Sequence, residues 1–72
     1  DMKTTTITTA SGATITATIH GTNVDIIQDG VSVGTGVWSG SQIEDCTARL
    51  GAADGGETDE AYAALDAGLV TS

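Results

Sequence analysis

The segment that decides the fold is residues 13–20, Ala-Thr-Ile-Thr-Ala-Thr-Ile-His, in which apolar and polar side chains alternate strictly. Successive side chains of a strand point to opposite faces, so a period of two over eight residues indicates an antiparallel strand with one buried face. We therefore expect Ile15, Ala17 and Ile19 to face a core, with the threonines on the opposite side of the sheet.

Three more strands are predicted around this one. Residues 3–10 are rich in threonine, whose β-branched side chain favours extended backbone. Residues 24–28 and 31–37 are short apolar runs, and the second is expected to turn Val31, Val33, Thr35 and Val37 inward. The intervening Gly34 and Gly36 would leave the other face of that strand bare, which indicates a bulge or the close approach of a neighbouring segment.

Turn signals separate these runs at short intervals. Ser11-Gly12 predicts a two-residue hairpin, Gly21 to Asn23 a turn, and Asp29-Gly30 a type I′ hairpin turn, which needs positive φ at both positions. Connections this short predict a meander, in which each strand pairs with the next along the chain.

Beyond Ser39 the period of the pattern changes from two to 3.6. Ser41 and Glu44 form a capping-box pattern, and Ile43, Cys46 and Leu50 then share one helical face. These residues predict a first helix over 41–50, with Cys46 buried.

A second helix is predicted over 58–70, with Thr58 as its N-cap and acidic residues in its first turn. A Gly-rich acidic linker at 52–57 would join the two helices. The apolar stripe of the second helix consists of Ala61, Tyr62, Leu65 and Leu69.

The expected architecture is α+β: a four-stranded antiparallel β-meander followed by two short α-helices packed on one face. We expect one domain over residues 1–72, with the sheet in 3–38 and the helical part in 41–70, because the helices are the available cover for the apolar sheet face. Ile15, Ile19, Val33 and Leu65 are the expected core residues.

The residue types argue against catalysis and against cofactors. His20 is the one imidazole, at the end of the threonine face, and Cys46 is expected to point inward. One Cys and one His fall short of a zinc site. Residues 34–40 contain glycines before a predicted helix, but they lack the G-x-G-x-x-G spacing and a lysine. We expect no enzyme, no metal and no cofactor.

Charge is the strongest functional signal in the chain. Lys and Arg number 2 against 10 Asp and Glu, for a net charge of −8, which disfavours direct binding to nucleic acid. A functional interpretation is an array of carboxylates that mimics phosphates on a basic protein surface. Solubility, favourable charge at helix N-termini or a salt-loving host would also account for the acidity. The predicted partner-binding residues are Glu44, Asp45, Asp54, Glu57, Asp59, Glu60, Asp66 and Trp38. For Trp38, a core role between the sheet and the first helix is the alternative.

In size, acidity, lone cysteine and compact α+β plan, the chain resembles the small acidic inhibitors that phages encode, among them anti-CRISPR and nucleic-acid-mimic proteins. The resemblance implies a protein that blocks the basic nucleic-acid-binding surface of a host defence complex. It would act in the cytoplasm of the host cell, and no signal peptide or membrane-spanning run is evident in the sequence.

The alternative function belongs to a different class. A structural or accessory module, such as a small virion or host domain, would form a homodimer through an edge strand, because residues 3–10 carry a single charge to block such pairing.

Overall fold

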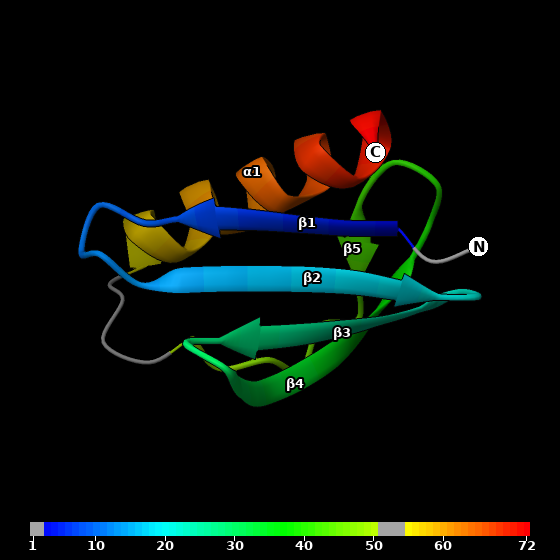
Figure 1. Cartoon of the computed structure of the whole chain (residues 1–72). Helices are drawn as coiled ribbons and strands as arrows, with labels where there is room; N and C mark the ends of the chain where they lie inside the picture. The colour runs from blue at the N-terminus through cyan, green and yellow to red at the C-terminus, as the bar shows by residue number, and fades with distance from the viewer. Residues whose placement is uncertain (1–2, 51–54) are drawn as a thin grey trace.

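The computed structural model describes residues 3–50 and 55–72, except for the side chains of 55–57. Within these residues, five strands form one antiparallel sheet in the order of the chain, and a single helix follows (Figure 1). The elements are β1 (Lys3–Thr8), β2 (Thr14–His20), β3 (Asn23–Gln28), β4 (Val31–Trp38), β5 (Ile43–Glu44) and α1 (Gly55–Thr71). The α+β class and the meander are as predicted. The structure has one strand more and one helix fewer than the four strands and two helices expected.

The strand pairings of β1, β2 and β3 follow the alternation of the sequence. Ile15, Ala17 and Ile19 are buried on the inner face, as predicted. On the outer face the threonines of β1 lie opposite those of β2, and the Oγ1 atoms of Thr6 and Thr16 lie 3.0 Å apart. Threonine therefore fills the solvated side of these strands with paired β-branched side chains.

The turns confirm one hairpin prediction and lengthen another. Asp29 (φ 51°) and Gly30 (φ 83°) both have positive φ, as the type I′ turn requires. Between β1 and β2, however, the Thr9 N–H donates to the Ala13 carbonyl at 2.9 Å, so the connection is longer than the two residues predicted.

The inner face of β4 differs from the prediction. The register with β3 shifts between Ile26 and Ile27, and beyond that shift it is Gly36 that is buried. Val31 is 64% exposed and Val37 is 40% exposed, while Val33 is half-buried against the core rather than within it. The prediction that Val31, Thr35 and Val37 face inward is therefore wrong, whereas Val33 does pack against the core. For Thr35 and Val37 the register shift is the reason, because it reverses which side chains beyond it meet the core.

The predicted helix over 41–50 is also wrong. Ser41 was expected to cap this helix, but it is Ser39 whose side chain contacts the following backbone. Its Oγ accepts from the Gln42 N–H at 3.1 Å and closes a turn. Then β5 pairs with the end of β4, and Thr47 and Arg49 donate their backbone N–H groups to carbonyls of β4 at 2.8 and 3.1 Å. Residues 43–50 are thus largely extended and lie against the sheet.

The glycines of β4 explain why this extended segment fits. A Cβ at Gly34 would overlap the backbone of Ala48, and a Cβ at Gly36 would lie 2.7 Å from Ile43 Cγ2. The predicted close approach of a neighbour is confirmed, and the neighbour is the segment that was expected to be a helix.

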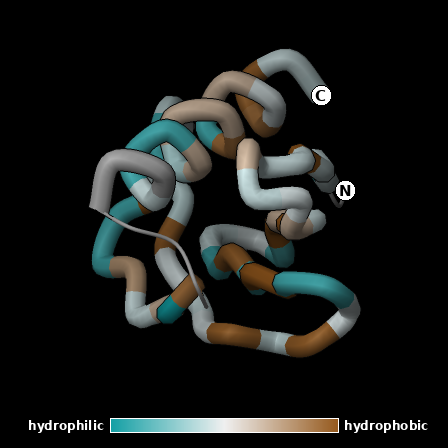
Figure 2. Tube along the Cα trace, turned by 90° about the vertical axis from the view of Figure 1, so that its left-hand side faces the viewer, coloured by the Kyte–Doolittle hydropathy of each residue, from teal (hydrophilic) through white to brown (hydrophobic). Residues whose placement is uncertain are grey.

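The helix α1 lies over the inner face of the sheet beside β1 (Figures 1 and 2). Leu65 and Leu69 are 0% exposed and Ala61 is 4% exposed, which confirms the predicted apolar stripe. The helix begins at Gly55, so the expected N-cap Thr58 lies inside it. Residues 55–57 of the expected linker are helical, and residues 52–54 lie outside the described residues. The fully buried side chains of α1 and of β2 and β3 together form the core.

Candidate binding surface

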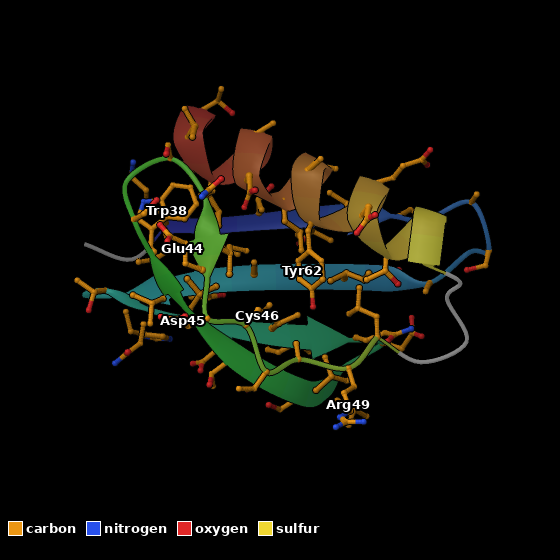
Figure 3. The ribbon with its side chains drawn as sticks, turned by 180° about the vertical axis from the view of Figure 1, so that it is seen from behind. Trp38, Glu44, Asp45, Cys46, Arg49 and Tyr62 are labelled. Atoms are coloured by element: carbon orange, nitrogen blue, oxygen red, sulfur yellow. The ribbon has the colours of Figure 1, made fainter. Side chains whose placement is uncertain are left out.

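Glu44 and Asp45 form the first exposed group of carboxylates, at the end of β5 (Figure 3). Ile43 packs against the core, so strand alternation turns Glu44 toward solvent. Asp45 has a positive φ of 49°, a conformation that aspartate tolerates better than most residues. The backbone thus ends the strand and presents two adjacent carboxylates.

Asp59 and Glu60 form the second exposed group, in the N-terminal part of α1. A carboxylate there is favoured by the helix dipole, whose positive end lies at the N-terminus. Asp54 and the side chain of Glu57 were expected to belong to the same group, but they lie outside the described residues.

Asp66, another of the predicted partner-binding residues, has a structural contact. Its Oδ1 accepts the Ile43 N–H at 2.9 Å and so joins α1 to β5. Asp66 is half-buried, and a carboxylate with one oxygen engaged in this way is less available to a partner than Glu44 or Glu60.

Trp38 ends β4 and is half-buried against the core. Its position corresponds partly to the predicted core role. Trp38 pairs with Ile43, and Val37 pairs with Glu44, so strand alternation turns the indole and the Glu44 side chain to opposite faces of the sheet. A half-buried aromatic side chain is suited to a protein interface, but the structure does not bring Trp38 together with the Glu44 carboxylate.

Cys46 contradicts its predicted burial. It is exposed, and its Sγ lies 3.3 Å from the Tyr62 hydroxyl, which in turn donates to the Ala48 carbonyl at 3.4 Å. The pKa of Tyr62 is raised well above its usual range, chiefly by burial and then by the hydrogen bond and charge of Cys46. The reason for the difference is the extended backbone at Cys46, which removes the helical face that would have turned it inward.

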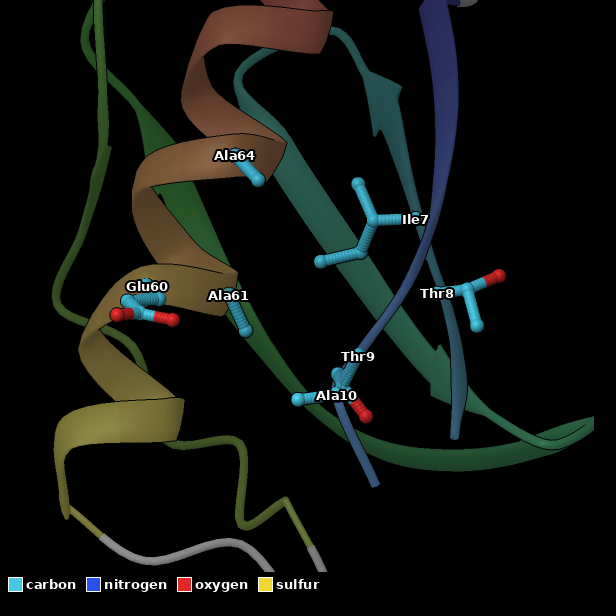
Figure 4. A pocket seen from close by; sticks show the side chains of 7 residues that line it. All are labelled: Ile7, Thr8, Thr9, Ala10, Glu60, Ala61 and Ala64. Carbon is cyan, nitrogen blue, oxygen red and sulfur yellow. The ribbon is translucent and has the colours of Figure 1, made fainter. Parts of the chain in front are cut away.

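A cavity of about 170 Å³ lies between the N-terminal half of α1 and the end of β1 (Figure 4). Ile7 points from β1 toward the helix, and Ala61 and Ala64 point from the helix toward the strand. Sequence reasoning missed this cavity because it depends on how far apart α1 and β1 pack, and no local pattern carries that information. The lining residues are Ile7, Thr8, Thr9, Ala10, Glu60, Ala61 and Ala64.

Ionic contacts within the described part of the chain are few. One ion pair is present there, between His20 Nε2 and Asp25 Oδ2 at 3.3 Å, and both side chains are about half exposed. The described residues include no group of three or more His, Cys, Asp or Glu side chains placed to hold a metal ion. Over residues 3–50 and 55–72, no helix has the length and apolar character needed to cross a membrane.

Comparisons with protein-family models, with curated proteins and with solved structures found no match to this chain.

Proposed function

We propose that this chain is a non-enzymatic acidic module that binds a basic protein surface. The finer proposal is that it blocks the nucleic-acid-binding surface of a host defence complex, as an anti-CRISPR-like nucleic-acid mimic. The observation that carries the proposal is the pair of exposed carboxylate groups, Glu44 with Asp45 and Asp59 with Glu60, on a chain of net charge −8.

The separation of these groups supports a phosphate-like array. Since Asp66 contacts Ile43, β5 lies near residue 66 of α1, seven residues beyond Asp59. At about 1.5 Å per residue this is about 10 Å along the helix, the axial rise of about three nucleotides on one strand of duplex DNA. Neither group has an ion-pair partner among the described residues, so both are available to a basic surface.

Self-association through β1 is the competing function. Here the packing of α1 argues against a free edge, because Ser72 Oγ donates to the Thr4 carbonyl at 3.3 Å. The approach of Gly68 to Thr5 likewise places the helix along β1. A strand whose carbonyls meet a helix offers less backbone to a second copy.

The test is a competition assay in which the protein displaces labelled duplex DNA or guide RNA from a nucleic-acid-binding effector, at two ionic strengths. The double variant Asp59→Asn/Glu60→Gln is compared with Asp25→Asn/Asp29→Asn. Each double variant removes two carboxylates, so the net charge changes from −8 to −6 in both.

We expect the first variant to associate about tenfold more slowly than the wild type and the second to change little, with both effects weaker at high salt. Equal, salt-insensitive behaviour of the two variants would refute the proposal. Binding of the chain to itself that strengthens with salt would instead favour the self-associating module.

A further inference from the structure

The cavity beside Glu60 has the composition of a site for one long cationic side chain. Four of its seven lining residues are apolar, two are threonines, and the single charged one is the acid Glu60. Its volume of about 170 Å³ is well below the range of about 300–1,000 Å³ for small-molecule pockets. A ligand of side-chain size is therefore the better match.

The apolar and polar residues of the lining have different roles. Ile7 is the large apolar residue of β1, and it is half-buried on the cavity side facing Ala61 and Ala64 (Figure 4). The Thr9 hydroxyl is engaged in its own turn, where it accepts the Ala13 N–H at 3.2 Å. Glu60 is thus the lining residue whose charge can select a ligand.

An arginine side chain can contact both the apolar residues and the carboxylate of this lining. Its aliphatic stem can cover apolar surface while its guanidinium stays at the mouth. The guanidinium is weakly hydrated, always charged and matched to a carboxylate in a two-point hydrogen-bonded pair. Arginine is also enriched among the residues that dominate binding energy at protein interfaces.

We propose that this cavity receives an arginine side chain of a basic partner, with the stem against Ile7 and Ala64 and the guanidinium on Glu60. The inference rests on the proposed function, because it names the side chain through which the acidic N-terminal part of α1 would hold its partner. Charge complementarity with Glu60 and with the chain as a whole carries the assignment.

The test uses two probes, Nα-acetyl-arginine amide and Nα-acetyl-lysine amide, titrated into the isotope-labelled full chain and followed by amide chemical shifts. Ala64→Leu fills the cavity and keeps the charge; Ala64 is exposed, so the fold should tolerate the change. Ala67→Leu, on another exposed helix position, is its control. Glu60→Gln removes the charge and keeps the shape, with Asp29→Asn, in the turn between β3 and β4, as its charge-matched control.

We expect the arginine probe to shift the amides of Ile7, Ala10 and Ala64, and to bind at least about threefold more tightly than the lysine probe. Ala64→Leu should weaken binding about tenfold or more, and Glu60→Gln severalfold, while both controls stay within about twofold of wild type. Shifts spread evenly over all acidic positions would overturn the proposal, as would equal binding of the two probes.

Failure of this inference can be told apart from failure of the proposed function. If Ala64→Leu still displaces nucleic acid from a basic effector as well as wild type, the arginine site is wrong and the acidic binding function stands. If the arginine probe binds in the cavity but carboxylate removal has no effect on competition, the cavity assignment stands and the proposed function fails.

Discussion

Two regions lie on the inner side of this sheet, and they are held there by different forces. The helix α1 inserts Leu65 and Leu69, both 0% exposed. Residues 43–50 bring half-buried side chains and lie close to the backbone of β4 over Gly34 and Gly36. Buried side chains hold α1 in place. Backbone hydrogen bonds hold residues 43–50, which can approach β4 closely because Gly34 and Gly36 have no Cβ.

The difference teaches where stability is concentrated. Full burial of a leucine side chain contributes about 1.5–3 kcal/mol, whereas a typical backbone hydrogen bond contributes a net of about 0.5–1.5 kcal/mol. Residues 43–50 should therefore open before α1 does, as local openings begin where apolar burial is least. The segment that presents Glu44 and Asp45 is the more adaptable of the two.

The largest expected effect is in α1. Leu65→Ala should lower the free energy of unfolding by about 2–5 kcal/mol, because it leaves a cavity at a fully buried position. In a domain with stability of about 5 kcal/mol, this should nearly unfold the chain. Thermal denaturation measures the change, with Val70→Ala, at a position 52% exposed, as the control. A melting temperature close to wild type would remove Leu65 from the core.

The next effect is on residues 43–50. Gly34→Ala places a Cβ against the backbone of Ala48 and forces a side chain onto a φ of +153°. We expect a loss of about 1–3 kcal/mol, with faster hydrogen exchange at the amides of Thr47 and Arg49. Gly12→Ala is the matched control, since its φ is +91° but nothing lies within 4 Å of the added Cβ. Equal exchange in both variants would contradict the close contact.

An effect of similar size is expected where the Asp66 carboxylate joins α1 to Ile43. Asp66→Ala leaves the Ile43 N–H without its acceptor and should cost about 1–3 kcal/mol. Asp66→Asn keeps an acceptor oxygen and should cost less than about 1 kcal/mol. Chemical denaturation of the two variants compares them, and indistinguishable midpoints would show that the contact does not join α1 to β5.

The smallest effect appears at high pH. Because the pKa of Tyr62 is raised in the folded chain, its contribution to stability is fully present below its ordinary pKa of about 10. That contribution is lost as the pH rises beyond that value. Tyr62 is the one tyrosine, so ultraviolet absorbance of the phenolate follows it directly. Ionisation near the ordinary value would disprove the burial, and Cys46→Ala should lower the pKa only in part because burial remains.

Local patterns were sufficient for β2 and for most of α1. In residues 13–20 every second side chain is apolar, and no helix could bury that set on one face. Leu65 and Leu69 share one helical face with Ala61 and Tyr62, whereas a strand would turn the adjacent Ala61 and Tyr62 to opposite faces. For the candidate surface, the sequence could identify Glu44 and Glu60 as acidic residues, each next to an aspartate. It could not show that Asp66 is engaged by Ile43 or that Glu60 borders a cavity.

For residues 41–50 the sequence by itself predicted only a helix, and the tertiary structure overrode that prediction. Ser41 and Glu44 satisfy a capping box, and Ile43, Cys46 and Leu50 satisfy a helical stripe, but these are weak local preferences. The unpaired edge of β4 offered backbone hydrogen bonds, and Gly34 and Gly36 left space for Ala48 and Ile43 to approach. An extended segment can both form the hydrogen bonds to β4 and approach its glycines closely, whereas a helix can do neither. This is why the alternation of residues 13–20 predicted its own structure, whereas the structure of residues 41–50 was decided by the strand beside them.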